Sequence, residues 1–206
     1  MTTAGDPTDL MERIARDDDG ALEELVCAFA PALLRFAGRT LSDTEGAEDV
    51  VQEAFVRVWR ARRRWRPTAG VSTYLYTIVA RLCLNRRRSL SRRPGRVPLL
   101  EDDDRSHPAD GAPDPERLAA SSELRRALAE ELAALPRNQR AALLLRHEGG
   151  LSYQEIAAAL DTTPAAVESL LSRARARLRH RLAGWLGGGT AAAGTGHSEG
   201  NPAARG

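Results

Sequence analysis

Arginines are the residues of this chain whose type and spacing most clearly suggest a chemistry. The segment LSYQEIAAALDTTPAAVESLLSRARARL, residues 151–178, ends in arginines that recur along one predicted helix. Arginine donates hydrogen bonds to phosphate oxygens and to guanine, so such a helix is suited to nucleic acid. No acidic residue follows Glu168 in this segment, and ion pairs four residues apart therefore do not account for the arginines. We predict DNA contact here, with a merely solvated charged face as the alternative.

Capping signals place two helices in this segment, one on each side of the sequence DTTP. Ser152 and Glu155 have the S-x-x-E spacing of a capping box, and Thr163 followed by Pro164 is typical of a helix start. Two short helices joined by a tight turn form a helix–turn–helix, whose second helix enters the major groove of DNA. The predicted contact residues are Thr163, Ala165, Glu168, Ser169, Ser172, Arg173 and Arg175.

Charge is distributed in blocks along the chain, although the net charge is only +2. Every basic residue is an arginine. Residues 1–56 contain thirteen acidic residues and four arginines, whereas residues 57–96 contain thirteen arginines and no acidic residue. Blocks of opposite sign predict separate faces for separate partners, and the basic block suits a polyanion.

Composition divides the chain into two modules. Residues 94–116 are rich in proline and acidic residues, lack an apolar period, and are predicted to form a flexible acidic linker. Residues 187–206 are rich in glycine and alanine and are predicted to be a disordered tail. An N-terminal module at residues 8–93 and a C-terminal module at residues 117–186 remain.

Both modules are predicted to be helical, because alanine and leucine dominate and β-branched residues are scarce. Apolar residues of the first module recur at helical spacing, with a break near residues 17–20. Ser42 and Glu45 have capping-box spacing ahead of a second helical segment. We therefore expect an all-α protein of two small helical domains joined by the flexible linker.

The residue pattern does not support an enzyme. Cys27 and Cys83 lie far apart and are predicted to be buried thiols, and the four histidines are scattered. We find no catalytic set, metal cluster, glycine-rich phosphate loop or cofactor motif, and therefore expect no catalytic residue, metal or cofactor. No apolar run of about 18 residues and no signal pattern occur, so no membrane insertion and a cytoplasmic location are expected.

Three segments together resemble the sigma-70 family of bacterial transcription initiation factors, in its extracytoplasmic-function (ECF) group. AEDVVQEAFVRVWR (47–60) is similar to the region 2 helix that binds core RNA polymerase. Residues 71–88 resemble the helix that reads and melts the −10 promoter element. LPRNQRAALLLRHEGGLSYQEIAAALDTTPAAVESLLSRARARLR (135–179) resembles region 4, which reads the −35 element. The resemblance covers both modules in order.

The resemblance implies a role for each module. Asp49, Gln52, Glu53 and Val56 would bind the polymerase clamp. The residues implied in −10 recognition are Arg63, Arg64, Trp65, Arg66, Tyr74, Arg81, Asn85 and Arg88. The loop at residues 64–72, which carries several of these residues, would hold a flipped base. Unstacked bases stack on aromatic rings while arginines neutralise phosphates. Core packing is an equal alternative for the nearby Tyr76, and Trp65 is expected to serve both purposes.

Two departures from the family pattern affect the expected promoter sequence. Arg81 stands where many relatives carry an asparagine that reads the −10 element, and arginine favours guanine or phosphate. Glu168 and Leu170 replace residues of the second reading helix that are often basic, and glutamate can accept from a cytosine amino group. We therefore expect unusual −10 and −35 preferences.

Partners follow from the resemblance as well. It implies binding to core RNA polymerase and promoter DNA, and control by an anti-sigma factor. The acidic linker is either a solubilising spacer or a segment that mimics nucleic-acid charge in the RNA-exit path, and we weigh these evenly. The competing function is a stand-alone helix–turn–helix regulator that binds duplex DNA unaided.

Overall fold

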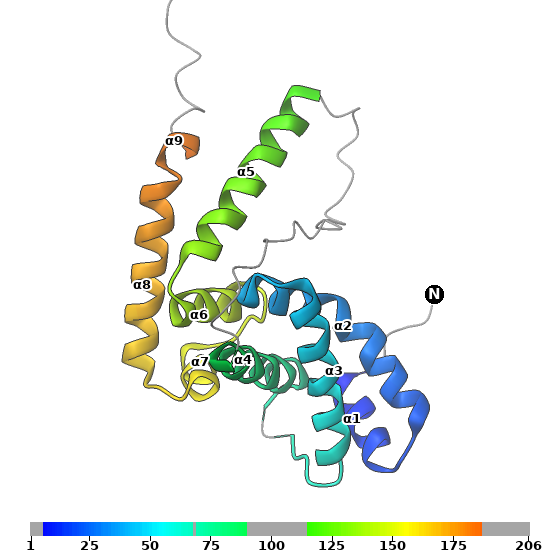
Figure 1. The fold of residues 1–206 in the computed structure, drawn as a ribbon. Coiled ribbons are helices and arrows are strands. Elements are labelled where there is room, and N and C mark those ends of the chain that lie inside the picture. The colour runs from blue at the N-terminus through cyan, green and yellow to red at the C-terminus, as the bar shows by residue number, and fades with distance from the viewer. Residues whose placement is uncertain (1–5, 68, 90–114, 187–206) are drawn as a thin grey trace, which may run out of the picture.

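The computed structural model describes residues 6–67, 69–89 and 115–186, and these residues form helices joined by short loops (Figure 1). In chain order the helices are α1 (Pro7–Ala15), α2 (Asp19–Leu41), α3 (Thr44–Ala61), α4 (Val71–Ser89), α5 (Pro115–Ala134), α6 (Arg137–His147), α7 (Tyr153–Leu160), α8 (Pro164–Arg181) and α9 (Ala183–Leu186). The expected all-α class is confirmed. Residues 94–114 of the predicted linker and the whole predicted tail lie outside the described residues, and the module boundaries stay predictions.

The first module is built on the long helix α2, which contacts α1, α3 and α4. Its side chains Leu25, Leu33 and Phe36 are fully buried, and Met11 and Ile14 of α1 are buried with them. The predicted break between α1 and α2 occurs at residues 16–18, where Asp18 caps α2 by accepting from the Ala21 N–H at 3.2 Å.

The expected capping box at Ser42 and Glu45 is wrong. Ser42 has a φ of 57°, in the left-handed region, and ends α2 instead of starting α3. Its hydroxyl is occupied by a donor from the second module, Arg140 Nη1, at 2.8 Å. Asp43 takes the N-cap position of α3, without a side-chain hydrogen bond to the helix. Only Ser42 and Asp43 separate α2 from α3, and Ser42 reverses the chain in a left-handed conformation. An N-cap residue needs an extended conformation instead, so Ser42 cannot cap α3.

The helix–turn–helix follows the predicted capping pattern. Ser152 N donates to Glu155 Oε2 at 2.7 Å and Glu155 N donates to Ser152 Oγ at 3.3 Å, so both halves of the capping box are present. Thr163 caps α8 by accepting from Ala166 N at 3.2 Å. Asp161, in the left-handed region at a φ of 53°, ends α7 and makes the turn. These caps set the start of α8 and hence the direction in which its exposed face points.

Replacing Ser152 with alanine should lower the free energy of unfolding by about 1 kcal/mol, because one N-terminal N–H of α7 loses its acceptor. Urea denaturation followed by circular dichroism measures this. Ser169→Ala is the matched control: Ser169 is exposed within α8, and alanine favours a helix there. Equal stability of the two variants would contradict the capping role.

The two modules form one continuous hydrophobic core. Helix α4 lies between α3 of the first module and α7 of the second (Figure 1), and α2 also contacts α6. Tyr76 of α4 is buried and packs edge-on against Phe36, with ring centroids 5.2 Å apart, so the core-packing alternative for Tyr76 is confirmed. A Cβ on Gly149 would lie 3.2 Å from the Tyr76 ring and 2.9 Å from the Leu145 carbonyl, which explains why only glycine fits this junction.

Candidate nucleic-acid interface

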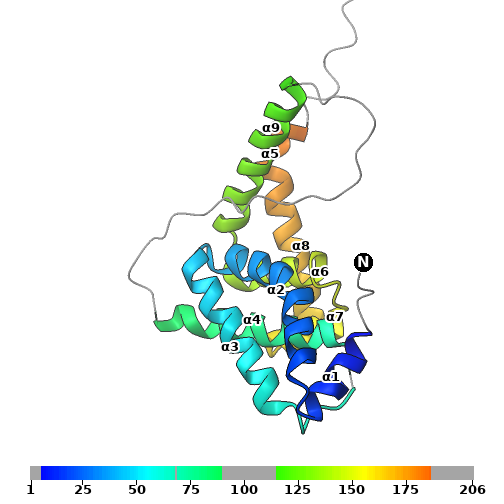
Figure 2. The same cartoon turned by 90° about the vertical axis from the view of Figure 1, so that its right-hand side faces the viewer.

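Helix α8 presents the predicted DNA-contact residues on its solvent side. Ala165, Glu168, Ser169, Ser172, Arg173 and Arg175 are all exposed. The opposite side of the helix, Val167, Leu171 and Ala174, is fully buried against α6 and α7. Thr163 is exposed as well, but its hydroxyl already caps α8. The C-terminal part of α8 extends past α6 on the same side of the molecule as α5 (Figure 2), and the exposed residues lie on the side of α8 that faces away from α6 and α7.

The predicted polymerase-binding residues share one face of α3. Asp49, Gln52, Glu53 and Val56 recur at helical spacing. Val56 is one of the exposed large apolar side chains among the described residues, at 40% exposure. Asp49 accepts from Arg86 Nη2 at 2.8 Å, and Glu53 accepts from Arg57 Nε at 2.8 Å. The ion pair with Arg86 was not foreseen: it joins the start of this face to the end of α4.

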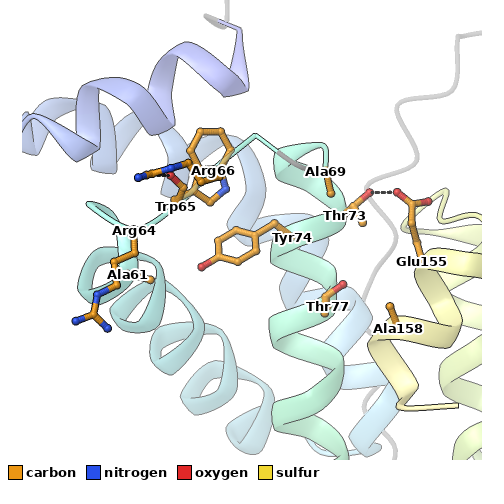
Figure 3. Close-up of a pocket in the computed structure, with 10 residues that line it drawn as sticks. All are labelled: Ala61, Arg64, Trp65, Arg66, Ala69, Thr73, Tyr74, Thr77, Glu155 and Ala158. Carbon is orange, nitrogen blue, oxygen red and sulfur yellow. Dashed lines mark hydrogen bonds between the residues drawn. The ribbon is translucent and has the colours of Figure 1, made fainter.

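A cavity of about 430 Å³ lies beside the loop between α3 and α4 (Figure 3). Trp65 and Tyr74 contribute aromatic rings to its wall, and Arg64 and Arg66 contribute guanidinium groups. Both rings are half-buried and pack partly against the core. Burial raises the pKa of the Tyr74 hydroxyl above its ordinary value. Rings flanked by arginines are the surroundings in which an unstacked base can bind.

Asp17 organises the start of this loop from a distant part of the chain. Its carboxylate accepts from Arg62 Nε at 2.7 Å and also from Arg63 Nη2. Hydrogen bonds from Arg63 and then Arg62 lower the pKa of Asp17. The guanidinium of Arg62 also lies 3.9 Å from the centroid of the Trp59 ring. Asp17 has a positive φ of 65°. The DDDG sequence around it predicted a break between helices, but not the ion pairs of Asp17 with Arg62 and Arg63.

Arg81, predicted to read the −10 element, is engaged by the second module. Its Nη2 donates to the Ala158 carbonyl at 2.7 Å and its Nε to the Ala159 carbonyl at 3.3 Å. Asn85, one turn further along α4, is exposed. Arg88 belongs to α4, but its side chain lies outside the described residues. Glu155 and Ala158 of α7 also line the cavity beside Trp65 and Tyr74, so the surface predicted to read the −10 element is partly covered by the second module.

Cysteine burial differs from the expectation at one position. Cys83 is buried, and burial raises the pKa of its thiol to about 12. Cys27 is exposed, contrary to the prediction, because it lies on the side of α2 that faces away from the helices packed on it. Across residues 6–67, 69–89 and 115–186, no cluster of histidine, cysteine and acidic residues could hold a metal ion. No helix in the same ranges is both long and apolar enough to span a bilayer.

Comparisons with known proteins identify the family of this chain. Residues 25–93 match the family description Sigma-70 region 2, and residues 125–178 match Sigma-70, region 4. The RNA polymerase sigma-H factor of Pseudomonas aeruginosa is 31% identical over 179 residues, which cover 85% of this chain and 93% of that protein. The ECF RNA polymerase sigma-E factor of Escherichia coli is 31% identical over 177 residues, which cover 84% of this chain and 92% of that protein.

Solved structures are similar as well. The sigma factor RpoE of Bartonella quintana, in complex with the anti-sigma factor NepR, has a TM-score of 0.60 and 25% identity, covering 78% of this chain and 96% of that one. CnrH, in complex with the cytosolic domain of CnrY, has a TM-score of 0.60 and 26% identity, covering 88% of this chain and 99% of that one. With both modules matched in order by full-length relatives, the chain belongs to the sigma-70 family of RNA polymerase sigma factors, in its ECF group.

Proposed function

We propose that this protein binds core RNA polymerase and directs it to specific promoters, without catalysing a reaction itself. The match to ECF sigma factors over most of the chain's length carries the proposal. Three surfaces support it, in chain order: the acidic face of α3, the cavity lined by aromatic and arginine side chains beside α4, and the exposed face of α8. The cavity would capture a base of the melted −10 element, and α8 would read the −35 element. The action takes place in the cytoplasm, where the polymerase and the DNA are.

Specific residues carry each step. Asp49, Gln52, Glu53 and Val56 would bind the clamp of the polymerase. Trp65 and Tyr74 would stack on the flipped base while Arg63, Arg64 and Arg66 neutralise phosphates. Once freed from α7, Arg81 would favour guanine or phosphate in the −10 element, beside Asn85 and Arg88, and Glu168 would favour cytosine in the −35 element. The complex of RpoE with its anti-sigma factor supports an anti-sigma partner for this chain.

Run-off transcription tests the proposal. The template is the promoter upstream of the protein's own gene, with purified core polymerase, and the reaction is run with and without this protein. Transcripts that depend on the protein would establish an initiation factor. A shift of duplex DNA by the protein alone, without core binding or transcripts, would instead support the stand-alone regulator.

Replacing Val56 with arginine should weaken binding to core polymerase by about tenfold or more. The polymerase surface would have to receive a cation where the wild-type α3 presents an apolar side chain among carboxylates. Val56 is already exposed in the free chain, so stability should stay within about 0.5 kcal/mol. Binding of a fluorescently labelled protein to core polymerase measures the affinity. Glu23→Arg is the control, because it changes the charge of an exposed site on α2 by a larger amount; an equal loss in both variants would indicate a general charge effect.

A further inference from the structure

The loop between α3 and α4, residues 62–70, carries Trp65 and two of the guanidinium groups that line the cavity (Figure 3). Of the described residues from 63 to 70, Trp65 is the only one that is not exposed. Its N–H donates to the Ala61 carbonyl at 3.0 Å, which joins the start of the loop to the last turn of α3. A loop with so few buried apolar contacts opens locally at a low free-energy cost. Contacts made by its polar side chains therefore matter for holding Trp65 in one place.

Asp17 supplies such contacts from the turn between α1 and α2, which lies beside the end of α3 (Figure 2). One carboxylate oxygen accepts from Arg62 Nε at 2.7 Å, and the other accepts from Arg63 Nη2. Arg62 is also held from α3, because its Nη1 donates to the Trp59 carbonyl at 2.9 Å and its guanidinium lies 3.9 Å from the centroid of the Trp59 ring. A carboxylate shared by two guanidinium groups forms a network, in which a surface ion pair contributes more than an isolated one.

The turn that carries Asp17 is itself fixed. The Asp17 N–H donates to the Ile14 carbonyl at 3.0 Å, and Ile14 is fully buried. The next residue, Asp18, caps α2 and also accepts from Arg13 Nε at 2.9 Å. Asp17 has a left-handed φ of 65°, a conformation that asparagine and glycine also adopt. The turn by itself therefore requires no carboxylate, and the charge of Asp17 serves the two arginines of the loop.

We propose that Asp17 is a positioning residue for −10 recognition: it holds the start of the loop through Arg62 and Arg63 and thereby keeps the Trp65 ring at the cavity. The inference rests on the proposed function, in which Trp65 stacks on an unpaired base. Holding the loop before DNA arrives lowers the entropy cost of ordering it when the base binds. The Arg63 side chain is 70% exposed while it pairs with Asp17, so it can still reach a phosphate.

Two substitutions of Asp17 test the role of its carboxylate. Asp17→Gly removes both oxygen atoms and favours the same left-handed turn, whereas Asp17→Asn keeps the shape and one acceptor but removes the charge. With core polymerase and the promoter upstream of the protein's own gene, we expect Asp17→Gly to slow promoter opening by about 5- to 20-fold. Asp17→Asn should fall between this variant and the wild type. A wild-type rate in Asp17→Gly, or a loss explained by weaker binding to core polymerase, would overturn the proposal.

Glu24→Gln is the matched control. It weakens the ion pair between Arg13 and Glu24, which joins α1 to α2 near the same turn but does not include the loop. Promoter opening should stay within about twofold of the wild type, as expected for an exposed ion pair. An equal loss in Glu24→Gln and Asp17→Gly would show that any disturbance of the α1–α2 turn slows opening, which would contradict a specific role for Asp17.

A double-mutant cycle asks whether Asp17 acts through Trp65. The rate of opening is compared among the wild type, Asp17→Gly, Trp65→Leu and the double variant. If Asp17 acts by holding the ring in place, adding Asp17→Gly to Trp65→Leu should slow opening by less than about twofold. Two losses that multiply in the double variant would mean that the residues act independently, and the positioning role would be wrong.

Fluorescence reports on the loop without polymerase or DNA. Trp59→Phe and Trp185→Phe leave Trp65 as the only tryptophan of the chain, and phenylalanine keeps a ring beside Arg62. In this background we expect Asp17→Gly to raise acrylamide quenching of Trp65 by about twofold, because a loop that moves more admits the quencher more often. Glu24→Gln should leave quenching unchanged. Unchanged quenching in Asp17→Gly would overturn the proposal. If quenching rises but the wild-type protein opens no promoter, the proposed function fails while the hold of Asp17 on the loop stands.

Discussion

Replacing Arg140 with methionine is expected to lower the free energy of unfolding by about 3 kcal/mol, the largest stability effect we predict for a single side chain. The guanidinium is buried between the modules. Its Nη1 binds the Thr40 carbonyl and the Ser42 hydroxyl, and its Nη2 binds the carbonyls of Ala133 and Leu135. The Thr40 carbonyl belongs to the last turn of α2, where the helix itself supplies no N–H donor. Methionine fills a similar volume but leaves these acceptors without their donor.

Urea denaturation measures this effect, with two comparison variants. Arg125→Met removes an exposed arginine of α5 and should change stability by less than about 0.5 kcal/mol. Arg140→Lys keeps the charge but cannot donate from a planar fork to acceptors on both sides, so its stability should fall between the wild type and methionine. If Arg140→Met is as stable as Arg125→Met, the carbonyls are satisfied in another way and Arg140 does not hold the junction together.

Replacing Trp65 with leucine is expected to reduce promoter opening by about 10- to 100-fold, as loss of one stacked base predicts. Leucine keeps much of the apolar contact with the core but has no ring on which a base can stack. Trp65→Phe should therefore stay within about threefold of the wild type. Permanganate reactivity of unpaired thymines in the promoter measures opening directly, with core polymerase and each variant at saturating concentration.

Two controls separate stacking from folding in this experiment. Binding to core polymerase should be unchanged in Trp65→Leu, since Trp65 is not one of the four α3 residues proposed to bind it. Unfolding free energies of the leucine and phenylalanine variants should be similar, because Trp65 is only half-buried. If leucine opens the promoter as well as phenylalanine, Trp65 acts through packing, and the cavity does not bind a base by stacking.

Local signals in the sequence were sufficient for the second module's helices and for the exposed face of α8. The capping pattern at Ser152 and Glu155 and at Thr163 and Pro164 predicted where α7 and α8 begin, because caps depend only on neighbouring backbone groups. The same reasoning was wrong at Ser42. That position has the right neighbours for a cap, but a left-handed turn and a donor from Arg140, 98 residues away in sequence, decide its conformation.

What the sequence by itself determined, then, is the all-α class, the family resemblance and the candidate residues of three surfaces, since periodicity and motifs are local properties. Only the tertiary structure decided how those surfaces face one another. It joined Arg81 to the carbonyl end of α7, placed Glu155 and Ala158 in the wall of the Trp65 cavity, and buried Arg140 against α2. The two arginines reach residues far apart in the chain mainly through backbone carbonyls, and every residue type has the same carbonyl. No sequence pattern could therefore have signalled them.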